Sequence, residues 1–127
     1  MAPHPRLAVC GAGNAGAAIA ADSAPPGTRD ELFGLPEFAR SIAPNVEQGD
    51  TFITPGSETC SGKTGFARLA AASTNAAEAV AGADVVMITA PAMHHTVFWD
   101  AVATHLAPGQ IALFNTGYFG CLRHAAR

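Results

Sequence analysis

The chain has 127 residues, of which 49% are hydrophobic and only 13% are charged, and its formal net charge is −3. A chain of this length can bury one hydrophobic core and therefore forms one domain at most. The absence of a basic excess argues against nucleic acid or an anionic membrane as the main ligand, and no apolar run is long enough to span a bilayer. The low charged share predicts a surface partly covered by a partner or by another domain.

The three cysteines, Cys10, Cys60 and Cys121, are odd in number, widely spaced and free of a C-x-x-C motif. This usage is typical of a reduced, cytoplasmic protein and not of a secreted disulfide scaffold. The histidines show no metal-ligand spacing such as H-E-x-x-H, so we expect no metal site.

The first predicted strand, Leu7–Cys10, leads into three glycines at the spacing G-x-G-x-x-G, namely Gly11, Gly13 and Gly16. The first glycine permits a tight bend, the second lets the backbone approach a pyrophosphate, and the third lets helix and strand pack closely. A helix over residues 14–24 would offer unpaired N–H groups to the anion. The motif in this context predicts dinucleotide binding, and a purely structural glycine turn is the alternative. A signal peptide is disfavoured because the glycines interrupt the apolar stretch.

The second predicted strand, within residues 28–34, is poor because Asp30 and Glu31 stand where a buried parallel strand is apolar. We expect a short or distorted strand. Residues 35–42 then predict a short helical turn, with Pro36 at its first position.

Two further strands are predicted at Val46–Thr54 and Phe66–Thr74, and they form a β-hairpin. The loop between them imitates a phosphate-binding loop, but five residues separate Gly56 from Gly62 where the Walker motif has four. Without a strand-to-helix context, ATP or GTP binding is disfavoured, and an exposed hairpin tip is the simpler interpretation.

The second half of the chain alternates helix and strand. Asn75 and Glu78 form a capping-box-like start for a short helix that ends at Gly82. Then follow a continuous apolar strand at residues 85–89, a helix at residues 96–106 and a strand at residues 111–114. The alternation predicts a parallel sheet whose carboxyl-end loops face a ligand crevice.

Five segments together resemble the NAD(P)-dependent opine dehydrogenases of the octopine/nopaline type: CGAGNAGAAIAADSA, LFGLPEF, GFARL, AVAGADVVMITAPAMHH and IALFNTGYFG. The glycine turn and GADVV are shared with relatives of glycerol-3-phosphate dehydrogenase and ketopantoate reductase, which form the alternative. Asn14, LPEF and the N-x-G-Y-F-G stretch favour the opine type.

The resemblance implies an α/β fold: a Rossmann-type, doubly wound, mostly parallel sheet with a β-hairpin insertion, forming a single incomplete domain over residues 1–127. Enzymes of this family join an amino acid to a 2-oxo acid by reducing an imine with a nicotinamide cofactor. Their helical C-terminal domain, which supplies the catalytic residues, has no counterpart here, so no catalytic residue is carried over. We expect a missing domain or second chain as partner, possible homo-oligomers, and cofactor binding without turnover. A non-catalytic nucleotide-binding module and an inactive remnant are the alternatives.

The same resemblance places the cofactor, NAD or NADP, against Gly11, Ala12, Gly13, Asn14, Ala15, Gly16, Ala90, Pro91, Ala92, Asn115 and Gly117. Gly34 stands where an acidic residue normally binds the adenosine ribose. Glu37 lies on the following turn, and Arg29 or Arg40 could instead meet a 2′-phosphate, so the choice of cofactor stays open.

Some residues allow two interpretations. His94 and His95 follow a strand end and could contact substrate or cofactor, or could serve only at the helix start. Tyr118 and Phe119 could stack on a ligand or fill a domain interface. Trp99 is expected to pack in its helix.

Overall fold

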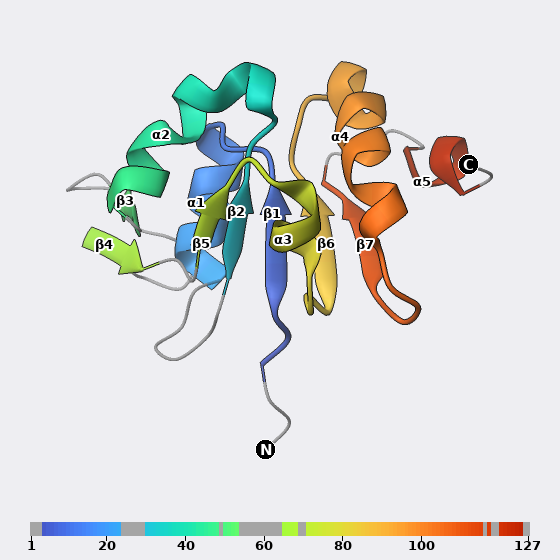
Figure 1. The fold of residues 1–127 in the computed structure, drawn as a ribbon, viewed down its shortest axis with the longest axis horizontal. Coiled ribbons are helices and arrows are strands. Elements are labelled where there is room, and N and C mark those ends of the chain that lie inside the picture. The colour runs from blue at the N-terminus through green and yellow to red at the C-terminus, as the bar shows by residue number, and fades with distance from the viewer. Residues whose placement is uncertain are drawn as a thin grey trace.

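The structure, a computed structural model, describes residues 4–23, 30–48, 50–53, 65–68, 71–115, 117 and 120–125. A five-stranded parallel sheet lies at its centre (Figure 1), in the spatial order β5–β2–β1–β6–β7. Its strands are β1 (Leu7–Cys10), β2 (Glu31–Phe33), β5 (Ala71–Ser73), β6 (Val85–Ile88) and β7 (Ile111–Phe114). After β1 the chain adds β2 and β5 on one side, and it then returns to add β6 and β7 on the other side. This order confirms the predicted Rossmann-type fold, and it places the topological switch point between β1 and β6.

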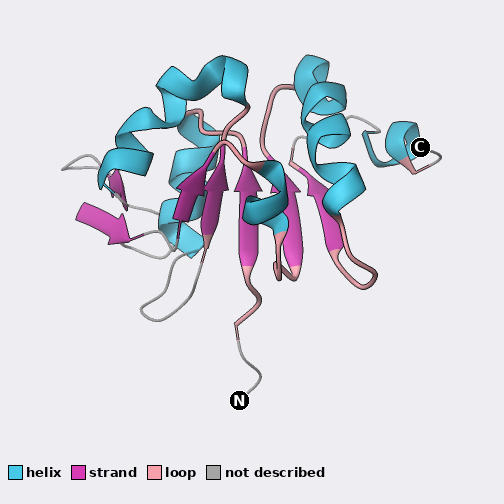
Figure 2. Ribbon diagram, viewed as in Figure 1, coloured by secondary structure: helices cyan, strands magenta, loops and turns pink. Residues whose placement is uncertain are grey.

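Helices cover both faces of the sheet (Figure 2). One face packs against α1 (Asn14–Ser23) and α2 (Ala39–Gln48), through a cluster of Val9, Leu32, Ala20 and Ile42. The other face packs against α3 (Ala76–Val80) and α4 (His95–Val102), and α5 (Gly120–His124) lies beside α4. Short 3-10 turns, η1 (Pro36–Phe38), η2 (Ala92–His94) and η3 (Ala103–His105), adjoin α2 and α4.

The alternation of side chains along β1 explains why its sequence is apolar throughout. Ala8 and Cys10 belong to the cluster beneath α3 and α4, whereas Val9 belongs to the cluster beneath α1 and α2. All three side chains are completely buried. A strand covered on both faces has no polar side, and burying a residue such as Val9 contributes about 1.5–3 kcal/mol.

The predicted hairpin is present as β3 (Asp50–Ile53) and β4 (Gly65–Arg68), which pair antiparallel outside the main sheet and lie against α1. The Walker-like loop between them falls outside the described residues. Two boundaries are wrong in the prediction. Residues 46–48 are helical and not part of a strand, because α2 continues past Pro44 and packs against β5 and β3. The stretch 66–74 is not one strand but contains parts of two, β4 and β5, and β5 joins the main sheet beside β2.

Two further differences concern helices near the C-terminus. The predicted helix at 96–106 consists of α4 followed by the 3-10 turn η3, and α5 was not predicted. Five residues such as those of α5 carry too little periodicity to identify a helix from sequence. Trp99 packs against Phe114, with ring centroids 5.6 Å apart, as expected of a packing residue.

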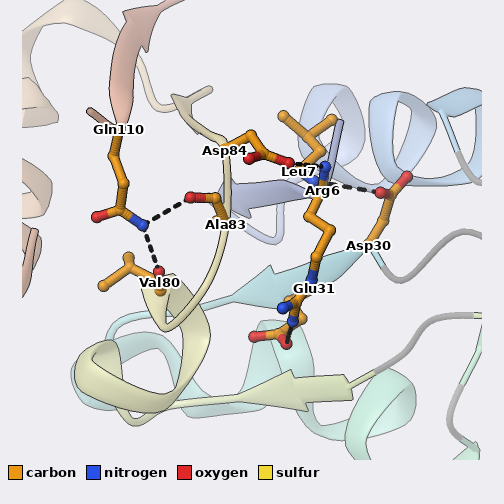
Figure 3. Close-up of polar contacts among 8 residues, drawn as sticks. All are labelled: Arg6, Leu7, Asp30, Glu31, Val80, Ala83, Asp84 and Gln110. Carbon is orange, nitrogen blue, oxygen red and sulfur yellow. Dashed lines mark hydrogen bonds and ion pairs between the residues drawn. The ribbon is translucent and has the colours of Figure 1, made fainter. Parts of the chain in front are cut away.

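Asp30 and Glu31, the polar residues at the start of the second strand, contact the residues at the amino end of β1 (Figure 3). The backbone N–H of Leu7 donates to buried Asp30 at 3.4 Å, and the Arg6 guanidinium lies 3.4 Å from a carboxylate oxygen of Glu31. The backbone N–H of Arg6 donates to the Asp84 carboxylate at 2.7 Å. This edge lies opposite the carboxyl ends of the strands, so these residues act in stability.

On the same edge, the side chain of Gln110 donates to the carbonyl oxygens of Val80 and Ala83, at 2.8 and 2.7 Å. These bonds tie the start of β7 to the turn after α3. The strand itself remains partly exposed, because Ile111 and Leu113 point away from the α3 and α4 face and are 60% and 40% exposed. None of the described helices is long and apolar enough to cross a membrane.

Candidate functional site

The bend after β1 needs glycine at its first position. Gly11 has φ +128°, a conformation that favours glycine, and a Cβ there would lie 2.7 Å from Oγ1 of Thr89. The N–H of Gly11 donates to the Phe33 carbonyl at 2.8 Å, and the Thr89 hydroxyl lies 3.2 Å from the carbonyl oxygens of Cys10 and Gly11. The turn is therefore held by a backbone carbonyl of β2 on one side and by the Thr89 side chain, just after β6, on the other.

The other two glycines of the motif have different surroundings. A Cβ on Gly16 would overlap the carbonyl oxygen of Gly11, so α1 can lie this close to β1 only because Gly16 has no side chain. A Cβ on Gly13, by contrast, would meet no atom within 4 Å. The space in front of Gly13 is open where the first N–H groups of α1 lack partners within the helix. Such a bare helix start suits the two linked phosphates of a dinucleotide.

A cleft of about 190 Å³ lies beside this turn, at the carboxyl ends of β1, β2 and β6. It is lined by Gly11, Ala12, Gly13, Gly34, Leu35, Phe38, Ser41, Thr89, Ala90, Pro91, His94 and Phe98. Ligands of open α/β sheets bind in such a crevice at the switch point. The lining is mostly apolar, with a few hydroxyl and backbone polar groups, as in many cofactor sites.

Five of the residues assigned from the sequence line this cleft: Gly11, Ala12, Gly13, Ala90 and Pro91. The others lie around it. Asn14, Ala15 and Gly16 form the first turn of α1, and Ala92 begins η2.

Asn115 and Gly117 follow β7 at the same edge of the sheet, and the N–H of Asn115 donates to the Ile88 carbonyl at 2.9 Å. They do not line the cleft itself. Tyr118 and Phe119 lie outside the described residues, so their two interpretations stay open.

The end of β2 carries no acidic side chain. Gly34 directly follows the strand and is buried, and a Cβ there would lie 3.2 Å from Cβ and Cγ2 of Ile42. Glu37 and Arg40 are exposed, and neither lines the cleft. Arg29 falls outside the part of the chain that the structure describes. The usual carboxylate contact to the adenosine ribose is therefore absent at this position.

The two adjacent histidines have different environments. His95 is 1% exposed, its Nε2 lies 3.0 Å from the Ala90 carbonyl oxygen, and its ring centroid lies 5.3 Å from that of Phe114. It is a core residue that holds the backbone behind the cleft. His94 is half-buried and lines the cleft, with its ring centroid 6.2 Å from that of Phe38. Only His94 can touch a ligand there.

Sequence reasoning missed the aromatic wall of the cleft. The sequence places Phe38 within the predicted turn at residues 35–42 and Phe98 within the predicted helix at residues 96–106, and neither pattern indicates a contact with a ligand. Phe98 packs edge-on against Phe33, with centroids 6.2 Å apart at 89°, so it joins the core to the cleft. Their position after a strand could have indicated these residues, because ligands bind at the carboxyl ends of parallel strands. Leu35 and Phe38 follow the end of β2, and Thr89 directly follows β6.

No side chain with a fixed charge lines the cleft among the described residues. Burial raises the pKa of the Cys10 thiol to about 12, so this cysteine, just before the glycine turn, is an inert core group. Within the described ranges, no group of three or more His, Cys, Asp or Glu side chains could hold a metal ion.

No protein-family model matches the chain. Among solved structures, octopine dehydrogenase in complex with NADH and agmatine superimposes with a TM-score of 0.71 at 20% identity, over 87% of this chain. Octopine dehydrogenase with NADH and L-arginine matches with a TM-score of 0.69 at 19% identity. A PanE/ApbA family ketopantoate reductase from Ralstonia eutropha matches with a TM-score of 0.65 at 23% identity, over 93% of this chain and 37% of its own.

The matched region spans 28% of the octopine dehydrogenase chain. At these identities the likeness is one of fold, and it confirms at that level the resemblance to opine dehydrogenases that the sequence motifs indicate. The ketopantoate reductase match agrees with the motifs that the two groups share.

Proposed function

We propose that this chain is the cofactor-binding part of a nicotinamide-dependent oxidoreductase of the opine dehydrogenase type. The observation that carries the proposal is the bare turn Gly11–Gly13 at the start of α1, which opens onto a cleft at the switch point of the sheet. NADH in the similar octopine dehydrogenase structures supports a nicotinamide dinucleotide as the ligand.

In this proposal the chain's residues bind and orient the cofactor. The first turn of α1, with Asn14, Ala15 and Gly16, receives the pyrophosphate, and Gly13 leaves the space for it. Ala90, Pro91 and Ala92, with Asn115 and Gly117 beyond β7, border the rest of the cofactor. The nicotinamide supplies the hydride chemistry when bound.

The groups that bind and act on the amino acid and the 2-oxo acid come from a further helical domain or a second chain. The described residues that line the cleft include no carboxylate and, in His94, only one histidine. Within the described ranges no hydrogen bond orients that histidine's ring, so we assign it no catalytic role. We expect the 127 residues to bind cofactor without turnover.

The ketopantoate reductase likeness supports a second candidate, a cofactor-binding part of a reductase of that type. A third is a nucleotide-binding module without catalysis, since this fold serves several functions. The candidates separate when a longer chain carrying the remaining domain is assayed. Consumption of NADH with an amino acid plus a 2-oxo acid supports the first, and consumption with ketopantoate alone supports the second.

Cofactor binding is tested by titrating NADH and NADPH while following nicotinamide fluorescence, with Gly13→Asp as the test variant. The aspartate adds a negative side chain in the open space in front of the turn, and we expect at least about tenfold weaker binding. Ala107→Asp adds the same charge at an exposed site near the opposite edge of the sheet and serves as the control. Equal affinity in all three proteins, each folded by circular dichroism, would remove the proposal.

A further inference from the structure

Part of the cleft is lined by side chains and not by the bare backbone of the glycine turn. Leu35 and Phe38 come from the segment after β2, and His94 and Phe98 come from the segment after β6. The ring centroids of Phe38 and His94 lie 6.2 Å apart, and the two ring planes are tilted by 46°. We call these two residues the ring pair.

Both rings are carried on short turns with fixed backbones. The N–H of Phe38 donates to the Leu35 carbonyl at 2.9 Å, and the N–H of His94 donates to the Pro91 carbonyl at 2.8 Å. Each bond closes a 3-10 turn at the end of a strand, so the ring pair is positioned by the sheet. Phe38 is nevertheless 49% exposed, so part of its ring is accessible to a ligand in the cleft.

The neighbouring strand end lacks the group that usually selects the cofactor. A carboxylate after β2 accepts hydrogen bonds from the ribose hydroxyls of NAD and repels the 2′-phosphate of NADP. Here Gly34 takes that place, and Ile42 packs so close that a side chain could enter only if Ile42 moved. The exposed Glu37 and Arg40 follow in the chain, and neither lines the cleft.

Resting on the proposed function, we infer that the adenosine end of the cofactor is held by stacking of the adenine on the ring pair, and that the site does not select between NAD(H) and NADP(H). Stacking uses the flat face of the base and does not depend on the group at the ribose 2′ position. The hydroxyl of Ser41, which also lines the cleft, is a neutral polar group beside the base. Affinity for both cofactors therefore depends on Phe38.

The test compares the dissociation constants of NADH and NADPH by isothermal titration calorimetry for the wild type and three variants. In the wild type we expect the two constants to agree within about threefold, and in Phe38→Ala we expect both to rise about tenfold, as the loss of one stacking contact requires. Phe38→Tyr keeps the stacking face and retains binding. Val46→Ala removes a side chain of similar exposure on α2, outside the cleft, and leaves both constants unchanged.

A wild type that binds one cofactor more than about 30-fold tighter than the other would overturn the inference while leaving the proposed function intact. Unchanged affinity in Phe38→Ala would do the same. Because Phe38 is half exposed, we expect its variants to keep the wild-type unfolding temperature. If neither dinucleotide binds the wild type, the proposed function itself fails.

Discussion

Gly16 lies so close to Gly11 that a Cβ on Gly16 would overlap the carbonyl oxygen of Gly11. The contact joins the first turn of α1 to the bend after β1, and both groups belong to the backbone. No side-chain rotation can therefore relieve a substitution at Gly16. The geometry of the anion-binding helix start depends on this approach.

We expect Gly16→Ala to destabilise the fold by at least about 2 kcal/mol, because α1 must move away from β1 to make room. Gly13→Ala is the matched control, since its Cβ would meet no atom within 4 Å, and we expect a change within about 0.5 kcal/mol. Urea denaturation measures both values. Equal stability of the two variants would show that the approach of Gly16 to Gly11 is not required.

Glu31 predicts a dependence of stability on pH. Burial raises the pKa of its carboxyl above 4.5, and Arg6 only partly opposes this effect. Because the folded protein binds this proton more tightly than the unfolded chain, the free energy of unfolding falls as pH rises through the window just above 4.5.

Glu31→Gln removes that titration. We expect the stability of the variant relative to the wild type to increase as pH rises from 4 to 7, where the glutamate becomes charged. Denaturant unfolding at several pH values measures the difference. A relative stability that falls over this range would mean that the ion pair with Arg6 outweighs the burial of the carboxylate.

Cys10 and Cys121, the two cysteines in the described ranges, should differ in reactivity. Cys10 is fully buried and its pKa is raised to about 12, whereas Cys121 is exposed on α5. We expect iodoacetamide at pH 8 to alkylate Cys121 in the folded protein and to reach Cys10 only in urea. Peptide mapping by mass spectrometry separates the sites. Rapid labelling of Cys10 without denaturant would indicate that β1 opens readily.

Self-association remains a prediction that rests on β7. This edge strand, Ile111–Phe114, carries no charged residue, and Ile111 and Leu113 are exposed on a face that no described helix covers. Such an edge tends to pair with another chain. We expect the wild type to form oligomers at high concentration in analytical ultracentrifugation, and we expect Ile111→Lys to shift it toward monomer.

Val46→Lys is the control, because it places the same charge at an exposed apolar position of α2, which lies at the β5 side of the sheet and not beside β7. It should leave the association unchanged. A wild type that sediments as a single monomeric species would contradict the prediction.

By itself the sequence determined the features that depend on neighbouring residues: the strand Leu7–Cys10, the glycine bend and α1, and the apolar strand β6. Backbone sterics and periodicity act over a few residues, so glycine spacing and apolar runs identify such elements. The sequence also shows that the second strand begins with the polar residues Asp30 and Glu31, but it does not show that they contact Leu7 and Arg6.

The tertiary structure decided everything that joins distant segments. In the folded chain the Ile42 side chain lies against Gly34. His94 lines the cleft whereas His95 is buried in the core. Phe38 lies beside His94, although more than fifty residues of chain separate them. These relationships depend on the register of β1, β2 and β6, which brings three strand ends to one edge. The pattern of one strand does not identify which distant strand pairs with it, and the aromatic lining of the cleft could therefore emerge only from the folded sheet.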